Sequence, residues 1–580
     1  MNSLNKPIVW MVWDGAAGWA TRRMLEEGKL PNLCKIMKSG SMADAIPPSP
    51  NCQTPPSLAT LFTGTWPRNH GIHGFSIPNS GVKTSVLEST SGFDIKNLKA
   101  EPIWSYIGEK NYKSVLVHIP WAMPLNANKV SKGVMFAVEG YSKRVTRGGV
   151  LEVFRSDFEV EKSYQVGPYE ISVYVDVEGV AKINSNQTGH QIILKPDEER
   201  IYNEHCLNLN DNNKLMIQTH LRKDDGALLV MYSGVWEVRT SNSKEQDSYE
   251  DQTGPFIGEG LGNAYRRGVF GPRLIDGGDG QAEKVLVSTI KWAAQYFRRS
   301  SAAALRKFPN ADLYMIYQPC IDDIEHEMIG WCDPQSKCYC PEIAEKAWLA
   351  ICEVYQMADD HLNDILTYFD ENCTIVISSD HGMAGMTHTV HINEALQKNG
   401  LLKFNDKNEI DLSTTSLFYH PANNGSIWVN PDIKDKAKRK DILLKTVEIL
   451  RSLLHSNGNV PVLKAIYPMD SGDKQDGYIS AMGDLFLEVS DGFELSDKRS
   501  SSREIIVPTL KSASHATNSK RSSLHGIFYA KGEGISENMD LGKVDNRSLV
   551  PLICSQLGIL PPPNIEGIIP SEIKNSYQHK

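Results

Sequence analysis

Two short runs of apolar residues, each followed by an acidic residue, constrain this chain more than any other feature. Residues 8–13 (Ile-Val-Trp-Met-Val-Trp) precede Asp14-Gly15, and residues 374–378 (Thr-Ile-Val-Ile-Ser) precede Ser379-Asp380-His381. A short run that is apolar throughout is typical of a parallel strand that is covered on both faces. In such α/β sheets, ligands bind beyond the carboxyl ends of the strands. We therefore expect Asp14 and Asp380 at a ligand-binding edge.

Strand-like and helical segments alternate through much of the remaining chain. Further strands are expected at residues 114–119, 313–317 and 527–530, and helices at 18–39, 57–63, 285–306, 341–369 and 547–557. This alternation predicts an α/β fold with a mostly parallel, doubly wound sheet that has helices on both faces.

Two stretches depart from this alternation. Residues 151–282 carry short strands such as 171–177 and 226–232, separated by polar loops, which is typical of a β-rich insertion. Residues 401–500 form a second, smaller segment of mixed α/β character, which we expect to be a cap insertion. The core is then expected to comprise residues 1–150, 283–400 and 501–580.

Composition argues against several classes of function. The chain has 580 residues and a net charge of −9, so it is not expected to bind the backbone of a nucleic-acid duplex. No apolar run reaches transmembrane length, and no secretory leader is expected before the first strand. The ten cysteines lack the spacing of a disulfide framework, so a reducing, cytoplasmic location is expected. Cys332, Cys338 and Cys340 form one local group, either free thiols, a disulfide or a structural metal site.

Carboxylates and imidazoles are concentrated where strands are expected to end. Asp380 and His381 offer two ligand types side by side, and Asp322 and His326 have a spacing that puts both on one face of a helix. Mixed carboxylate and imidazole ligands suit Zn²⁺, with Mn²⁺ or iron as competitors. Each motif alone is common in turns and on helix surfaces. Their combination with Asp14 predicts a site for two divalent metal ions.

In this order, the motifs resemble those of the alkaline phosphatase superfamily, in its type I phosphodiesterase/nucleotide pyrophosphatase branch. The resemblance covers residues 8–140, 283–400 and 505–575. It implies an alkaline-phosphatase-like core and a metal-dependent hydrolase that cleaves a phosphodiester or pyrophosphate bond in a nucleotide-like substrate. The residues that carry it are Asp14-Gly15, Leu30-Pro31-Asn32-Leu33, Thr54-Pro55-Pro56, Leu61-Phe62-Thr63-Gly64, Pro67, His70-Gly71-Ile72, Asp322, His326, Ser379-Asp380-His381-Gly382 and 526–534.

The resemblance also implies a role for each site residue. Asp14, Asp380 and His381 would hold one metal ion. Thr54 would bind the same ion and act as the nucleophile, which gives a covalent phospho-threonine intermediate. Asp322, His326 and a late histidine would hold the second ion. His515 lies eleven residues before Gly526, which is the expected spacing, and is favoured over His525, which directly precedes that glycine.

One departure from the family pattern concerns the phosphoryl oxygen. The family often has an asparagine just after its His-Gly-Ile segment, whereas here the sequence continues as His73-Gly74-Phe75, with no asparagine before Asn79. Ser57, or backbone N–H groups at the start of the helix after Thr54, would be the substitute. The other histidines that stand near motifs or in apolar runs are expected to be structural, namely His70, His73, His118, His388 and His391.

Two other functions stay open at this level. A phosphomonoesterase, or a phosphonate or sulfate ester hydrolase, would use the same core and metals, because sister branches differ in what surrounds the non-bridging oxygens. A non-catalytic scaffold that retained the fold is the alternative from another class, although every expected ligand position has a candidate. The expected partner is a small-molecule phosphate ester, and binding to a membrane is not expected.

Overall fold

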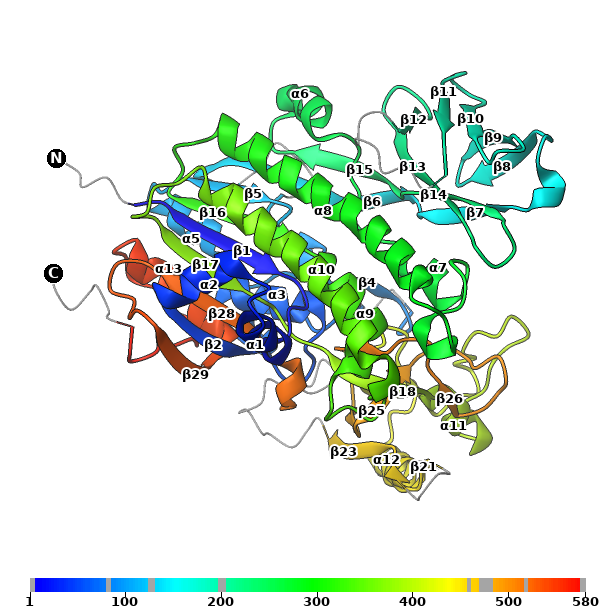
Figure 1. Cartoon of the computed structure of the whole chain (residues 1–580). Helices are drawn as coiled ribbons and strands as arrows, with labels where there is room; N and C mark the ends of the chain where they lie inside the picture. Colours follow the sequence, from blue (N-terminus) through cyan, green and yellow to red (C-terminus); the bar gives the residue numbers. More distant parts are fainter. Residues whose placement is uncertain are drawn as a thin grey trace.

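The computed structural model describes residues 6–79, 85–123, 131–196, 205–455, 460–468, 483–515 and 520–573. The first five residues, at which no secretory leader is expected, lie outside these ranges. A large central sheet runs through the molecule, with long helices packed along it and two smaller units attached at one side (Figure 1).

The central sheet has nine strands in the order β15-β6-β5-β16-β1-β17-β28-β2-β29. The pairs β6-β5, β5-β16, β16-β1, β1-β17 and β2-β29 are parallel, whereas β15-β6, β17-β28 and β28-β2 are antiparallel. The predicted mostly parallel sheet is therefore confirmed. The strands are β1 (Ile8–Trp13), β2 (Ser41–Ile46), β5 (Ser114–Val117), β6 (Val134–Thr146), β15 (Val235–Thr240), β16 (Leu313–Gln318), β17 (Thr374–Ser378), β28 (Gly526–Lys531) and β29 (Met539–Asp545).

Helices cover both faces of this sheet, because successive side chains of a buried strand point to opposite sides. In β1, Val9, Met11 and Trp13 pack into one core with α8, α9 and α10, whereas Ile8, Trp10 and Val12 pack into another with α3, α5 and α13. The helices are α1 (Gly18–Glu26), α2 (Pro31–Lys38), α3 (Thr54–Thr63), α4 (Pro67–His70), α5 (Ile103–Glu109), α6 (Ser243–Thr253), α7 (Gly262–Arg266), α8 (Gln281–Lys307), α9 (Cys320–Cys332), α10 (Pro341–Leu366), α11 (Ile392–Lys398), α12 (Lys436–Arg451) and α13 (Leu549–Gln556).

The helix predicted at residues 18–39 is two helices, so that prediction is wrong. The first ends at Glu26 and the second begins at Pro31, with Gly28 between them at φ +71°. A left-handed glycine is a common helix stop, and a proline can begin a helix but has no N–H to continue one. The break was missed because both signals lie inside a pattern that is otherwise helical.

Residues 149–232 form a separate β unit that projects from the central sheet (Figure 1). It has two four-stranded sheets, β11-β10-β9-β8 and β12-β13-β14-β7, and a hydrophobic core of its own. β15 then rejoins the central sheet beside β6, so this unit is shorter than the predicted insertion at 151–282. The strands are β7 (Gly149–Val153), β8 (Lys162–Val166), β9 (Tyr169–Val175), β10 (Ala181–Ser185), β11 (Gln191–Leu194), β12 (Cys206–Asn208), β13 (Lys214–Leu221) and β14 (Leu228–Tyr232).

A second unit lies within the predicted cap at 401–500. Its sheet has the order β19-β20-β24-β23 and packs with α11 and α12 around a further core. In contrast, β25, β26 and β27 pair with β18, the strand that follows Asp380-His381, which ties this region to the predicted site. The strands are β18 (Ala384–His391), β19 (Leu417–Tyr419), β20 (Ser426–Val429), β23 (Leu463–Pro468), β24 (Leu485–Val489), β25 (Gly492–Ser496), β26 (Ile506–Pro508) and β27 (Ala513–Ser514), with the short pairs β3 (Ser76–Pro78) and β4 (Ser89–Ser91), and β21 (Leu454–His455) and β22 (Val460–Pro461).

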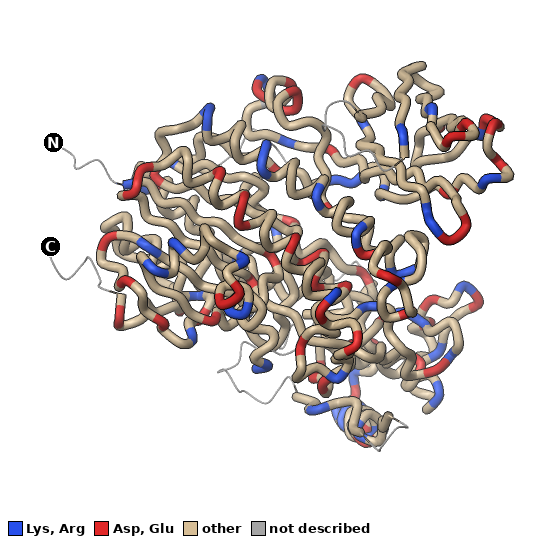
Figure 2. The backbone as a smooth tube through the Cα atoms, in the orientation of Figure 1, with Lys and Arg blue, Asp and Glu red and all other residues tan. Residues whose placement is uncertain are grey.

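Acidic and basic positions are mixed along the backbone, with a dense group of basic residues on α12 (Figure 2).

Within the described ranges, no helix has both the length and the apolar composition needed to cross a membrane. All ten cysteines lie in the described ranges, and none forms a disulfide. In the local group, the Cys338 thiol lies 3.2 Å from the Ser512 carbonyl oxygen, and no cluster of metal-ligating groups among the described residues includes these thiols.

Candidate active site

The predicted site residues come together at the carboxyl edge of the central sheet. Asp14 directly follows β1, and Asp380 and His381 follow β17. Asp322 and His326 lie on α9, which begins two residues after β16 ends. Thr54 is the first residue of α3, and His515 follows β27. Parallel strands bring their carboxyl ends to one edge, which explains how Asp14 and Asp380 can meet although they are 366 positions apart in the chain (380 − 14 = 366).

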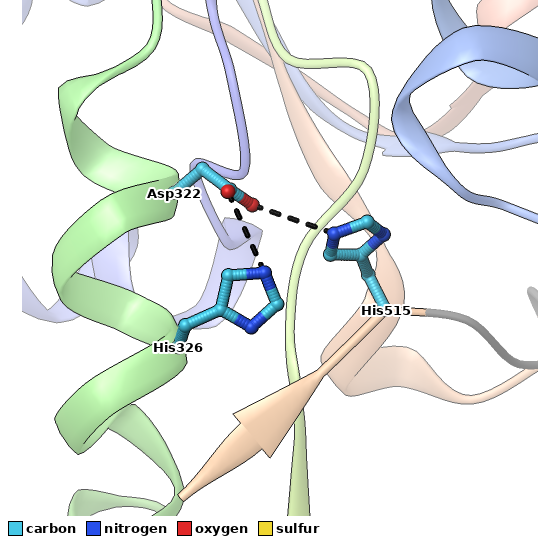
Figure 3. Close-up of side chains that lie close together, drawn as sticks. All are labelled: Asp322, His326 and His515. Carbon is cyan, nitrogen blue, oxygen red and sulfur yellow. Dashed lines mark ion pairs between the residues drawn. The ribbon is translucent and has the colours of Figure 1, made fainter. Parts of the chain in front are cut away.

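Asp322, His326 and His515 form the first cluster of ligand groups (Figure 3). The Asp322 carboxylate lies between the two rings, with Oδ2 3.5 Å from His326 Nε2 and Oδ1 3.6 Å from His515 Nε2. One ligand atom from each residue lies within 4.8 Å of the others. His326 Nδ1 lies 2.9 Å from the Ala513 carbonyl oxygen. This contact fixes Nδ1 as the protonated nitrogen and leaves the Nε2 lone pair available to a ligand.

Asp14, Asp322 and His381 form the second cluster, which shares Asp322 with the first. His381 Nε2 lies 3.5 Å from Asp14 Oδ1 and 3.2 Å from Asp380 Oδ2. The His381 ring also stacks on the His515 ring, with 3.9 Å between the ring centroids. The two clusters are therefore adjacent, and all six residues predicted to bind metal through carboxylates or imidazoles belong to one continuous group.

The buried oxygens of this group fit divalent cations. Asp14 Oδ1, Asp322 Oδ1 and Asp380 Oδ2 accept no hydrogen bond from any described residue. A buried carboxylate without compensation is costly, and a bound cation supplies that compensation. Together with three imidazole nitrogens, these oxygens make the carboxylate and nitrogen donor set that zinc takes.

Burial sets the protonation of the group in the protein alone. It raises the pKa of the Asp380 carboxyl to about 8 and lowers the pKa of the His381 imidazole to about 3. Burial also raises the pKa of Asp14 well above its usual value, and the neighbouring Asp380 adds to that effect. The imidazole is therefore neutral at physiological pH, which is the form that binds a metal ion.

Thr54 lies against this group at the start of α3. Its side-chain oxygen is 3.1 Å from His381 Nε2, and the residue is 5 % exposed. Gln53 and Asn51 fix the loop before it, because the Gln53 amide N–H donates to Asn51 Oδ1 at 3.0 Å. The buried helix α3 thus presents one hydroxyl to the cluster of carboxylates and imidazoles.

The two predicted substitutes for the missing asparagine differ in the hydrogen bonds that they already make. The Ser57 hydroxyl is fully buried and donates to the Cys52 carbonyl oxygen at 3.1 Å, so it would have to break this bond to reach a substrate. Pro55 and Pro56 have no N–H, and the Ser57 N–H is bonded to the Gln53 carbonyl. Among the described residues the Thr54 N–H has no acceptor, so it is the donor in that first turn that remains for a phosphoryl oxygen.

Of the two late histidines, His515 is the one that lies in the cluster, whereas His525 belongs to neither group of ligands. Other histidines have structural contacts. His70 Nε2 lies 3.1 Å from the Thr60 hydroxyl, and His388 lies 3.1 Å from His455 through their Nε2 atoms. His118 does not lie inside β5 but directly follows it, with φ +56°, in the core.

Two residues at the site were missed at the level of the sequence. The Tyr317 hydroxyl donates to Asp14 Oδ2, and Asn546 Nδ2 donates to the Asp380 carbonyl oxygen at 2.8 Å. Tyr317 stands five positions before Asp322 at the end of a predicted strand, which is the signal that could have found it. Asn546 lies on the short turn before α13 and had no local motif to mark it.

Comparisons with known proteins agree on one family. Residues 9–518 match the model of the family described as type I phosphodiesterase/nucleotide pyrophosphatase. An ectonucleotide pyrophosphatase/phosphodiesterase from Caenorhabditis elegans is 32 % identical over 108 residues, a match that spans 18 % of this chain and 12 % of that relative.

One solved structure shares the fold over nearly its whole length. An inactive variant of murine ectonucleotide pyrophosphatase/phosphodiesterase 5, in complex with AMP, has a TM-score of 0.50 and 14 % identity, with 97 % of both chains covered. The human counterpart has a TM-score of 0.47 and 14 % identity, with 96 % of both chains covered. The match to the family model extends over most of the sequence and includes the whole cluster of carboxylates and imidazoles. The chain therefore belongs to the type I phosphodiesterase/nucleotide pyrophosphatase family.

Proposed function

We propose that this protein hydrolyses a phosphodiester or pyrophosphate bond in a nucleotide-like substrate, through a phospho-threonine intermediate on Thr54. The observation that carries the proposal is the place of the Thr54 hydroxyl, 3.1 Å from His381 Nε2 within two ligand clusters that share Asp322. Family membership supports the reaction class.

Two divalent cations, with zinc as the first candidate, would occupy the two clusters. Asp14, Asp380, His381 and Thr54 would hold one, and Asp322, His326 and His515 the other. When bound, such ions lower the pKa of a coordinated hydroxyl or water and neutralise charge on the transferred phosphoryl group. The neutral imidazoles and the unpartnered carboxylate oxygens supply the donors that this role requires.

The proposed reaction begins at the hydroxyl of Thr54. Its oxygen forms a bond to phosphorus, the bond from phosphorus to the leaving oxygen breaks, and the hydroxyl proton leaves with that oxygen. Water later breaks the bond between threonine and phosphorus, which restores the hydroxyl and releases the phosphorylated product. The backbone around Thr54 keeps the nucleophile in place, since α3 is buried along its whole length.

A nucleotide-like substrate is the finer part of the proposal. Phe75 is 45 % exposed, and its ring centroid lies 6.5 Å from that of His515, so it offers an apolar surface beside the cluster. An aromatic surface at that place suits a nucleobase. The AMP bound to the murine neighbour is consistent with the same substrate class.

The test is Thr54→Ala, with Thr54→Ser as the matched control that keeps a hydroxyl. We expect Thr54→Ala to lose at least 1,000-fold in kcat on bis-p-nitrophenyl phosphate, by analogy with other enzymes that lose their nucleophile. It should still bind most of its metal, because the carboxylates and imidazoles remain. Near-normal turnover by this variant would remove Thr54 from the reaction. A strong preference for p-nitrophenyl phosphate over the diester would favour the phosphomonoesterase instead.

A further inference from the structure

Tyr317 lies beside Asp14 because β16 and β1 are parallel neighbours in the central sheet. Val12 pairs with Tyr317 in this register, and the Asp14 N–H donates to the Gln318 carbonyl oxygen at 2.9 Å. Tyr317 and Val12 pack into the same core, on the face of the sheet that α3 covers. The tyrosine side chain therefore points to the side of the sheet from which Thr54 enters the site.

The phenol of Tyr317 makes one specific polar contact, with the carboxylate of Asp14. Its hydroxyl donates to Oδ2, and the two residues are 6 % and 3 % exposed. A buried phenol requires a hydrogen-bond partner, and here the carboxylate is that partner. The other oxygen, Oδ1, accepts no hydrogen bond from the described residues and lies 3.5 Å from His381 Nε2.

The two oxygens of Asp14 thus have different environments. One is held by a donor from the neighbouring strand, and the other faces the cluster. Rotation about χ2 of an aspartate is soft, so the carboxylate alone would not keep this orientation. A hydrogen bond to Oδ2 selects the orientation that presents Oδ1 to His381.

We propose that Tyr317 is a positioning residue that orients the Asp14 carboxylate for metal binding on the nucleophile side of the site. This inference rests on the proposed function only in its claim that Asp14 binds a metal ion. Tyr317 acts through Asp14. Hydrogen bonds of this kind to metal ligands typically change metal affinity or activity by 10- to 100-fold when they are removed.

Tyr317→Phe isolates the hydroxyl, because the ring stays in the core. The matched control is Tyr314→Phe on the same strand. Tyr314 is fully buried, donates to the Phe308 carbonyl oxygen at 3.0 Å and accepts from the Ala311 N–H at 2.9 Å. It belongs to the core on the opposite face of the sheet. Both variants lose a buried tyrosine hydroxyl, but only one loses a contact with Asp14.

The experiment measures zinc affinity by competition with a chelator, on full-length protein freed of metal. We expect Tyr317→Phe to bind one of two zinc ions about 10- to 100-fold more weakly, with kcat restored by excess zinc and KM little changed. Tyr314→Phe should match the wild type in zinc affinity, even if both variants have a lower Tm. Unchanged zinc affinity in Tyr317→Phe would overturn the inference. Failure of the wild type to bind zinc, Mn²⁺ or iron would instead overturn the proposed function.

A second measurement does not depend on how the phenylalanine variant folds. 3-Fluorotyrosine placed at position 317 keeps the ring and the hydroxyl. Its ¹⁹F resonance should shift when zinc is added to the metal-free protein, because the ion withdraws charge from the carboxylate that accepts its hydrogen bond. A resonance that does not move while zinc binds at both sites would contradict a role for Tyr317 through Asp14.

Discussion

His118 combines an unusual backbone conformation with complete burial. It adopts φ +56° directly after β5, and its ring packs against Phe256, Tyr296 and Phe297. Its Nε2 lies 2.8 Å from the Ser300 hydroxyl. Burial lowers the pKa of this imidazole to about 3, because the charged form would lose its hydration among aromatic rings. The native protein therefore holds His118 neutral at every pH at which it is expected to work.

This pKa predicts that His118 contributes to acid unfolding. The unfolded chain binds a proton at this histidine below its ordinary pKa of about 6.5, and the native state does so only near pH 3. Stability is therefore fully present above pH 6.5 and is lost as the pH falls toward 3. At pH 5 the loss is about 2 kcal/mol.

His118→Asn removes this titration, and asparagine tolerates the left-handed conformation. The difference in unfolding free energy between wild type and variant, from urea titrations, should shrink by about 2 kcal/mol between pH 7 and pH 5. A difference that is the same at both pH values would show that His118 takes up its proton at the same pH in the native state as in the unfolded chain.

Site residues with a local signal could be predicted from the sequence, and those with only a spatial signal could not. Asp322 and His326 share a helix turn, and Asp380 and His381 are adjacent, so each pair is visible in a few letters. Tyr317 meets Asp14 only through the register of two strands that lie 300 residues apart (313 − 13 = 300). Ser57 stays a prediction, and the sequence did not reveal that its hydroxyl donates to the Cys52 carbonyl oxygen.

At the scale of elements, α2 has a cap that comes from a different helix. Its preceding residue, Leu30, provides no side-chain acceptor. Instead the Asp359 carboxylate on α10 accepts the N–H groups of Asn32 at 3.0 Å and Leu33 at 2.8 Å, and Asn32 Nδ2 at 2.9 Å. These are the amides that a helix start leaves without partners. The Leu-Pro-Asn-Leu motif at residues 30–33 therefore also holds α2 against α10.

This cap predicts that Asp359→Ala is strongly destabilising. Two buried amides and one side-chain amide would lose their acceptor, which we expect to cost about 2–4 kcal/mol in the free energy of unfolding. The measurement is urea unfolding at pH 7.

The matched control is the next residue on the same helix. Asp360 is 65 % exposed in its side chain, and its carboxylate lies 3.9 Å from Arg298. Asp360→Ala should change stability by less than about 1 kcal/mol. Similar losses of unfolding free energy in both variants would mean that the hydrogen bonds of Asp359 stabilise the protein no more than an exposed carboxylate does.

Most elements could be predicted because their patterns are long or strictly apolar. The strands at 8–13 and 374–378 coincide with β1 and β17, and the helix expected at 341–369 is α10. The strand expected at 114–119 ends earlier, at Val117, since the left-handed backbone of His118 cannot continue it. This conformation is imposed by tertiary packing, which a single stretch of sequence does not reveal.

At the scale of the whole molecule, the central sheet concentrates buried acidic groups at one edge. The fully or nearly buried Asp14 and Asp380 lie close to Asp322, and one carboxylate oxygen of each of the three residues lacks a donor among the described residues. Such a cluster repels itself unless a cation is bound. The native fold and its metal ions should therefore depend on each other.

Removal of metal is expected to lower the stability of the entire chain. Ions that bind only the native state stabilise it by about 4 kcal/mol per site when their concentration is 1,000 times Kd. Dialysis against a chelator should lower Tm by several degrees, and added zinc should restore it, whereas magnesium should not. If metal analysis shows complete removal and Tm is unchanged, the stability of the fold does not depend on the metal ions.

The overall architecture followed from alternation of strands and helices, but the antiparallel placement of β28 did not. β28 lies between β17 and β2 and pairs with both in the opposite direction. A strand has the same apolar pattern in either direction, so its sense depends on where the preceding chain enters. The β unit is likewise shorter than the predicted insertion at residues 151–282. β15 resembles the strands of that unit in its sequence pattern but belongs to the central sheet.

The pairing of β6 with β15 brings the two ends of the β unit side by side. The chain leaves the central sheet after Thr146 and returns at Val235, and these two residues are direct partners in the antiparallel register. Their Cα atoms are thus about 5 Å apart. A tight turn could join them, and so could any foreign domain whose ends lie close together. A domain exchanged at these ends would keep the register of the central strands, but it would have to replace Met216, Leu229 and Met231, which the β unit contributes to the core that it shares with α8.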